Sequence, residues 1–236
     1  MRSLTLSLTV LLSLSLAAAS PASPASPASP ASPASPASAA KHKAKPSCAK
    51  KGSKTLRRGS GVRVFTAAAK SDGQKVVRLY GCLSANGRKQ VLSERSDDGF
   101  VTSSGFDDVR LAGRYVGWHS FATDVSCKAD CPPDYNAKRE SVIAYDLRRR
   151  RMARRSVLSS ATGPSLGYTG ASLALTQRGG LAWLSPATPG PQQLIVADRG
   201  GRRVLDSGAI AASSVRAEIS IVSWVRDGVE RFSRLH

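Results

Sequence analysis

The chain has 236 residues, of which 41% are hydrophobic, and it carries a formal net charge of +19 at pH 7. A basic excess of this size favours association with anionic partners and is not evidence about the fold. Its longest apolar segment, residues 4–16, is shorter than the roughly 20 residues that a membrane helix needs. Composition therefore excludes a membrane-spanning bundle and predicts a mature chain without a transmembrane segment.

The N-terminus has the pattern of a secretory signal peptide. Arg2 provides an early positive charge, residues 4–16 are apolar, and three alanines follow at positions 17–19. The first cysteine is Cys48, far from this cleavage region, so a lipoprotein anchor is not expected. We predict a signal peptide at residues 1–19 and a secreted or cell-envelope-associated protein.

A repetitive segment follows the signal peptide. Residues 21–38 are six copies of Pro-Ala-Ser, a composition that lacks the apolar side chains needed to offset the entropy of folding. We predict a disordered linker at residues 20–40 and a basic segment at residues 41–53. Residues 54–236 are then long enough for one domain with a proper core.

The four cysteines are Cys48, Cys82, Cys127 and Cys131. In an exported chain such residues usually form disulfides. Three pairings are possible, and the spacing favours Cys48 with Cys82 and Cys127 with Cys131. A zinc site is the competing interpretation, and it is weakened because the chain has only three histidines.

An internal repeat indicates the architecture. The segment "DVRLAGRYVGW" (108–118) aligns without gaps with "SVRAEISIVSW" (214–224), and "SLALTQRGGLAW" (172–183) fits with one extra residue. Downstream, "VIAYDLRRRRMAR" (142–154) aligns without gaps with "LIVADRGGRRVLD" (194–206). Short apolar runs separated by Gly-containing turns predict four units of four antiparallel strands each, with the last unit ending after its third strand.

An aromatic residue recurs at one position of the repeat. It is Phe65 in the first unit, then Trp118, Trp183 and Trp224. Recurrence at a fixed repeat position favours packing between units over ligand stacking.

The hairpin sequences, "LIVADRGGRRVLD" above all, resemble those of uncharacterised secreted bacterial β-propeller-like repeat proteins. The resemblance implies a fold more than an activity. We predict an all-β, β-propeller-like array of about four four-stranded repeats. A β-sandwich, or an open array completed by dimerisation, is the alternative.

The turns suggest a binding surface. In an up-and-down antiparallel unit, the first and third turns emerge at the same end. We predict that the basic side chains in and beside these turns form a polyanion-binding surface, and the residues are Arg88, Lys89, Arg148, Arg149, Arg150, Arg151, Arg202 and Arg203. Asp107, Asp108 and Glu140 are assigned to loops at the opposite, acidic end.

Chemical motifs are missing from the sequence. It contains no G-x-x-x-x-G-K-[ST] or H-E-x-x-H pattern, and no catalytic residue, metal or cofactor is predicted. The sequence favours a secreted non-enzymatic binding or interaction module for a protein, glycan or polyanion, associated with the cell envelope. The alternative is an exported hydrolase or lyase that uses Asp107, Asp108 or His119 at the propeller mouth.

Overall fold

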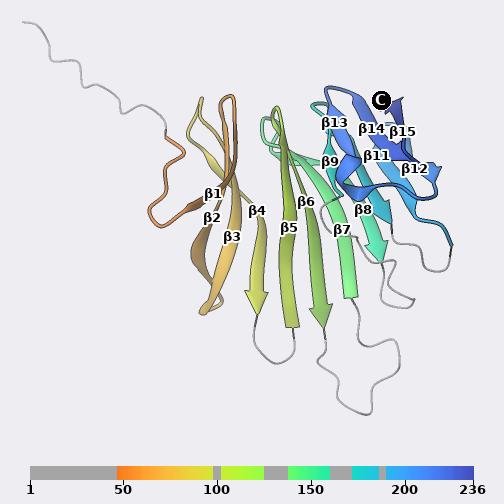
Figure 1. Cartoon of the computed structure of the whole chain (residues 1–236). Coiled ribbons are helices and arrows are strands. Elements are labelled where there is room, and N and C mark those ends of the chain that lie inside the picture. Colours follow the sequence, from red (N-terminus) through yellow and green to blue (C-terminus); the bar gives the residue numbers. More distant parts are fainter. Residues whose placement is uncertain (1–46, 98–101, 125–137, 160–171, 186–189) are drawn as a thin grey trace, which may run out of the picture. The chain divides into compact units, whose positions relative to one another are not determined.

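The structure, a computed structural model, describes residues 47–97, 102–124, 138–159, 172–185 and 190–236. Within these residues the chain forms fifteen strands and one short 3-10 helix (Figure 1). Every pairing between the strands is antiparallel and joins consecutive strands of the chain. The all-β, β-propeller-like array of four units is therefore confirmed.

The strands fall into the four units predicted from the repeat. Unit 1 comprises β1 (Lys54–Gly59), β2 (Val62–Ser71), β3 (Gln74–Leu83) and β4 (Lys89–Asp97). Unit 2 comprises β5 (Thr102–Ala112), β6 (Tyr115–Asp124), β7 (Lys138–Asp146) and β8 (Arg151–Ser159). Unit 3 comprises β9 (Ala174–Leu175), β10 (Leu181–Ser185), β11 (Gln193–Asp198) and β12 (Gly201–Ser207). Unit 4 follows the 3-10 helix Ala212–Ser214 and comprises β13 (Arg216–Glu218), β14 (Ile221–Arg226) and β15 (Val229–Arg234).

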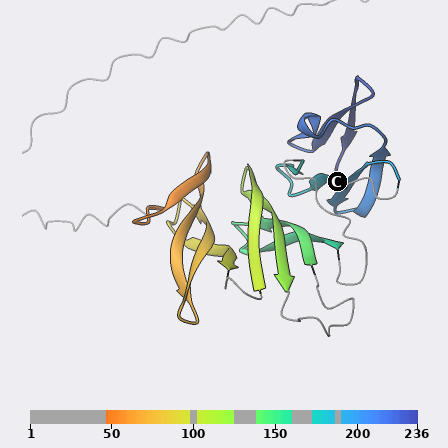
Figure 2. The same cartoon turned by 60° about the horizontal axis from the view of Figure 1, so that its bottom comes forward.

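Units 1 and 2 are joined into one eight-stranded sheet, which the sequence did not predict. The joint consists of two pairs between β4 and β5, Ser96 with Ser104 and Asp97 with Ser103. Only four residues separate these strands in the chain, so their adjoining ends pair like a hairpin. The two units diverge beyond this joint, as Figure 2 shows.

The core consists of layers between successive units, and an aromatic residue of the second strand belongs to each layer. Trp118 packs in a cluster with Val64 and Leu79 of unit 1. Trp183 packs in a cluster with Val142 of unit 2. Trp224 belongs to the cluster that joins units 3 and 4. All three tryptophans are buried, so the recurring position serves packing between units, as the repeat predicted.

Phe65 occupies the same repeat position in unit 1, but it packs against residues of unit 1 and the segment before it and not against another unit. It stacks on Tyr80 with 5.2 Å between the ring centroids, and its cluster includes the Cys48–Cys82 disulfide. That disulfide confirms the predicted pairing and ties the residues that precede β1 to the outer face of unit 1. Lys50 adds to this cover, because its Nζ lies 4.0 Å from the Tyr80 ring centroid. The predicted Cys127–Cys131 pair lies outside the described residues.

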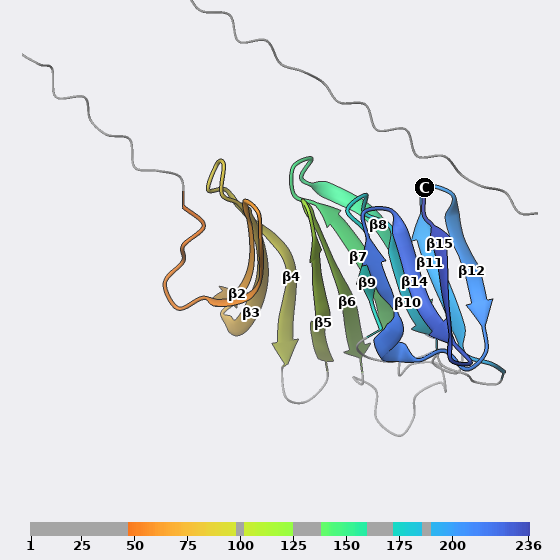
Figure 3. The same cartoon turned by 45° about the horizontal axis from the view of Figure 1, so that its top comes forward.

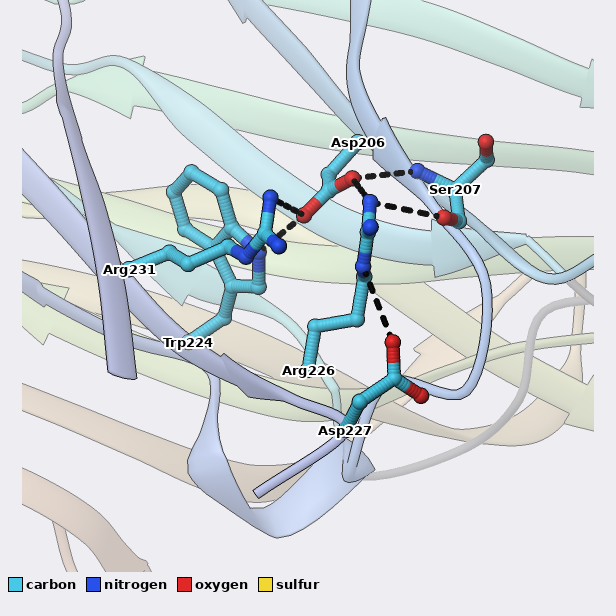
Figure 4. A network of polar contacts seen from close by, with 6 residues as sticks. All are labelled: Asp206, Ser207, Trp224, Arg226, Asp227 and Arg231. Carbon is cyan, nitrogen blue, oxygen red and sulfur yellow. Dashed lines mark hydrogen bonds and ion pairs between the residues drawn. The ribbon is translucent and has the colours of Figure 1, made fainter. Parts of the chain in front are cut away.

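A polar network joins units 3 and 4 (Figure 4). The side chain of Asp206 in β12 is largely buried and accepts a hydrogen bond of 2.7 Å from Nε1 of Trp224. It also forms ion pairs with Arg226 and Arg231 of unit 4. Desolvation opposes ionisation of this carboxyl, but the hydrogen bonds from Trp224 and Arg226 prevail and lower its pKa. The carboxylate therefore acts as an anchor between the two units.

No helix among the described residues is long and apolar enough to cross a membrane.

Candidate anion-binding site

The predicted basic turns of units 1 and 2 lie at one end of the sheet that these units form. Antiparallel strands alternate in direction, so the β1–β2, β3–β4, β5–β6 and β7–β8 turns emerge together. Figures 1 and 3 show these turns at the upper end of the two units. We call this the turn end.

A close backbone approach brings the turns of the two units together. Leu147, the first residue of the β7–β8 turn, is buried against Gly81 of β3. A Cβ atom built on Gly81 would lie only 2.4 Å from Cδ2 of Leu147. The Leu147 amide also donates a 3.2 Å hydrogen bond to the Arg114 carbonyl. Glycine at position 81 therefore lets the β7–β8 turn lie beside the β3–β4 turn.

In each of these two turns, an Asn or Asp side chain accepts hydrogen bonds from backbone amides of the turn. Oδ1 of Asn86 accepts a 3.0 Å hydrogen bond from the amide of Arg88. Oδ1 of Asp146 accepts hydrogen bonds of 3.0 Å and 3.1 Å from the amides of Arg148 and Arg149. Such Asx contacts stabilise one conformation of a turn. The backbone that bears the basic side chains is therefore held in place in both turns.

The two turns enclose a pocket of about 190 Å³. Its basic lining residues are Arg88, Lys89, Arg148 and Arg150, and the others are Gly81, Leu83, Asn86, Gln90 and Leu147. No Asp or Glu belongs to this lining. Nε of Arg150 lies 3.4 Å from Oε1 of Gln90, a contact that links the β7–β8 turn to β4. We call this cavity the basic pocket.

The Asp146 side chain at the end of β7 forms its ion pairs with arginines that do not line the basic pocket. Oδ2 of Asp146 lies 3.1 Å from Nε of Arg114, and its side chain is only 3% exposed. The pKa of Arg114 is raised, first by the hydrogen bond that its guanidinium donates to the Tyr115 hydroxyl and then by the Asp146 carboxylate. Arg149 lies at 4.0 Å from the same carboxylate. Oδ1 of Asp146 also accepts the amide hydrogen bond of Arg148, which does line the pocket.

Four of the predicted basic residues do not line this pocket. Arg149 is exposed, and Arg151 begins β8. Arg202 donates a 3.0 Å hydrogen bond to the Val157 carbonyl. Arg203 binds the buried carboxylate of Asp198 through contacts of 2.7 Å and 2.9 Å, which raises the pKa of Arg203 and lowers that of Asp198. Arg203 therefore has a structural partner.

The assignment of Asp107 and Asp108 to a loop is wrong. Both lie within β5, where the register with β6 shifts between Asp107 and Arg110. This bulge gives Asp108 a left-handed φ of 42°. Asp108 pairs with Arg110 at 2.5 Å, and its Oδ2 accepts a 3.0 Å hydrogen bond from the Leu173 amide. Asp108 thus anchors unit 3 to unit 2.

Glu140 was also assigned to a loop, and it lies instead in β7, buried beside His119. Nδ1 of His119 lies 2.9 Å from Oδ1 of Asp107, and Nε2 lies 3.7 Å from Oε1 of Glu140. The imidazole is therefore held between two carboxylates. His119 is 4% exposed, which limits its contact with any large substrate. Within the described ranges, no group of three or more His, Cys, Asp or Glu is arranged to hold a metal ion.

Comparisons with known proteins do not assign a family. No family model matches the chain, and no curated protein matches it. Among solved structures, the β-propeller domain of the Trilobed protease from Pyrococcus furiosus, described as having an open velcro topology, aligns with 7% identity and a TM-score of 0.29, covering 74% of this chain and 64% of that one. TolB from Acinetobacter baumannii aligns with 12% identity and a TM-score of 0.23, covering 74% and 55%. The chain thus spans less than two thirds of each of these proteins.

Proposed function

We propose that the chain is an exported binding module whose basic pocket holds anionic groups of a phosphate- or sulfate-bearing polymer. One observation carries the proposal: Arg88, Lys89, Arg148 and Arg150, contributed by two units, line one pocket without an acidic residue. Like charges brought together in this way repel one another, and a bound anion relieves that repulsion.

The chemistry of the lining residues suits oxyanions. A guanidinium presents several N–H donors in a plane and matches the oxygen atoms of phosphate or sulfate, while an ammonium acts as a compact point charge. Three arginines and one lysine line the pocket. Because the Asn86 and Asp146 contacts fix the turns, less ordering of the backbone is required when an anion binds.

Export is the second part of the proposal. The Cys48–Cys82 disulfide is of a kind that persists in oxidising compartments such as the cell exterior or the envelope. The predicted signal peptide at residues 1–19 and the Pro-Ala-Ser linker are in accord with a domain held away from its point of attachment. Anionic polymers of the cell envelope are then accessible ligands.

The test measures binding of heparin and of polyphosphate to the full-length mature chain as a function of salt concentration. The variant R148S/R150S removes two guanidinium groups from the basic pocket. We expect weaker binding, and a slope of log affinity against log salt that is reduced by about one for each lost contact. Heparin and polyphosphate distinguish a sulfate from a phosphate preference.

The matched control is R155S/R199S. Both arginines are exposed and lie outside the pocket lining, so the control removes the same charge from other places. We expect it to bind more tightly than R148S/R150S. Equal losses in the two variants would show that binding follows net charge alone, and the basic pocket would then be rejected as a site.

The exported hydrolase is a second candidate, favoured by the 2.9 Å contact between Nδ1 of His119 and Asp107. A carboxylate that orients an imidazole is a common part of general-base catalysis. Against it, Nε2 of His119 faces Glu140, and the ring is buried. If this candidate is right, H119Q abolishes turnover of a chromogenic ester or glycoside by the chain. Turnover that persists in H119Q rejects it.

A further inference from the structure

The fourth unit has a sheet edge that is free along β15. Just beyond the strand, the His236 carbonyl accepts a hydrogen bond from the Arg199 amide, and the His236 amide donates one to Asp198. The three strands of this unit are ordered β13–β14–β15, and no described strand pairs with the second edge of β15. In units 1, 2 and 3 the third strand pairs with a fourth. An unpaired edge presents rows of backbone donors and acceptors that can pair with another strand.

The backbone groups at this edge belong to alternate residues. The Leu235 amide donates a 2.7 Å hydrogen bond to the Ser220 carbonyl, so Leu235 directs its backbone groups toward β14. In an antiparallel strand, residues two or four positions from Leu235 direct their backbone N–H and C=O groups toward the same neighbouring strand, and the residues between them direct these groups to the opposite edge. Glu230, Phe232 and Arg234 therefore direct their backbone groups to the free edge.

The side chains of these three residues share one face of the sheet. They lie opposite Val225, Ser223 and Ile221 of β14, respectively. Glu230 and Arg234 are exposed, and Phe232 is 77% exposed, the highest value among the large hydrophobic residues that the structure describes. The edge thus carries an acid, an aromatic residue and a base at alternate positions.

We propose that two copies of the chain form a two-fold symmetric dimer in which their β15 strands pair antiparallel, with Phe232 opposite Phe232 of the partner subunit. In this register Glu230 lies opposite the partner's Arg234, and Arg234 lies opposite the partner's Glu230. The residues of these three pairs all direct their backbone groups to the free edge, so each pair can be joined by backbone hydrogen bonds. The two sheets then become one six-stranded sheet across the dimer axis.

Charge complementarity selects this register. A pairing centred on Glu230 places two acids opposite each other, and one centred on Arg234 places two bases opposite each other. Among the edge-facing residues, only the pairing centred on Phe232 matches both charges and also pairs the two aromatic rings. Cross-strand pairs of opposite charge and of aromatic residues stabilise sheets, whereas like charges directly opposite destabilise them.

Sedimentation of the full-length mature chain over a range of concentrations tests the proposal. E230R and R234E each place like charges opposite one another at two symmetric positions, so each is expected to raise the dimer dissociation constant at least about tenfold. The double variant E230R/R234E restores the opposite charges. It is expected to return the constant to within about threefold of the wild-type value.

The matched control is E218R, which makes the same charge change at an exposed position of β13 in the same sheet. It should leave the dissociation constant unchanged. A disruption as large as that of E230R would mean that the copies pack through the sheet face, and edge pairing would be rejected. A wild-type chain that stays monomeric also overturns the proposal, as does a double variant that fails to recover.

Hydrogen exchange on the wild-type chain gives a readout that needs no substitution. The amides of Glu230, Phe232 and Arg234 should exchange more slowly as protein concentration rises. The amide of Leu235, already bonded within the sheet, should change much less. Concentration-independent exchange at the first three positions contradicts the dimer.

Discussion

Replacing Gly81 by alanine tests the contact that brings the two basic turns together. In the interior of a strand, alanine is ordinarily more stable than glycine by about 0.5–1 kcal/mol, because glycine loses more backbone entropy on folding. Here the new Cβ would lie 2.4 Å from Cδ2 of Leu147 and 3.2 Å from Cδ1 of Leu92. Overpacking of a buried site costs about 1–3 kcal/mol. We therefore expect G81A to lower the free energy of unfolding by about 1 kcal/mol.

A double-mutant cycle separates this clash from other effects. Leu147 is 5% exposed, and L147A alone should cost about 3 kcal/mol through lost burial and a cavity. In G81A/L147A the clashing atoms are gone, and the methyl group introduced at position 81 fills part of the space. We expect the double variant to cost about 1–2 kcal/mol less than the sum of the single variants.

Urea unfolding of the three variants and the wild type measures these free energies. Additive losses, or a G81A variant that is more stable than the wild type, would refute the close approach. L147A also gives a functional readout, because it leaves the net charge unchanged. If Leu147 holds the two turns beside each other, L147A should elute from heparin at a lower salt concentration than the wild type.

Three further predictions concern other parts of the fold. Asp198 has a lowered pKa, chiefly because Arg203 donates hydrogen bonds to it. The stability that the ionised Asp198 contributes to the folded state is therefore complete above the ordinary carboxyl pKa of about 4, and it is lost as the pH falls through the lowered pKa. D198N should therefore flatten the dependence of unfolding free energy on pH below about 4, as measured by urea titrations. The disulfide between Cys48 and Cys82 spans 34 positions, and C48A/C82A should lose about 4 kcal/mol by the loop-entropy model. D206A should lose about 2–3 kcal/mol, because it leaves the buried indole N–H of Trp224 without its acceptor and removes the carboxylate that pairs with Arg226 and Arg231. Equal urea midpoints for variant and wild type would contradict either of these losses.

The repeat predicted most of the strand architecture. The gap-free alignment of residues 142–154 with 194–206 matches the observed β7–β8 and β11–β12 hairpins. The recurring aromatic position also matched the packing between units. These features depend on local pattern and burial, which a sequence records directly.

The pairing of charges could not be predicted in the same way. The alignment equates Asp146 with Asp198 and Arg151 with Arg203, yet only Arg203 binds its aspartate. Four residues separate β7 from β8, whereas two separate β11 from β12. The longer turn gives Asp146 a different partner, Arg114. Turn length and bulges, such as the one beside Asp107, decide which aligned charges meet, and neither is visible in a residue pattern.

The two ends of the array of units differ in a way that links the repeat to the proposed dimer. A repeat unit buries its faces against its neighbours, so the terminal units need another cover. Unit 1 has such a cover, because the disulfide to Cys48 holds a segment over Phe65 and Tyr80. On unit 4 the described residues leave Ile221 and Phe232 exposed. A dimer edge at β15 would place the aromatic ring of Phe232 in a contact while leaving the basic pocket, between units 1 and 2, accessible in both copies.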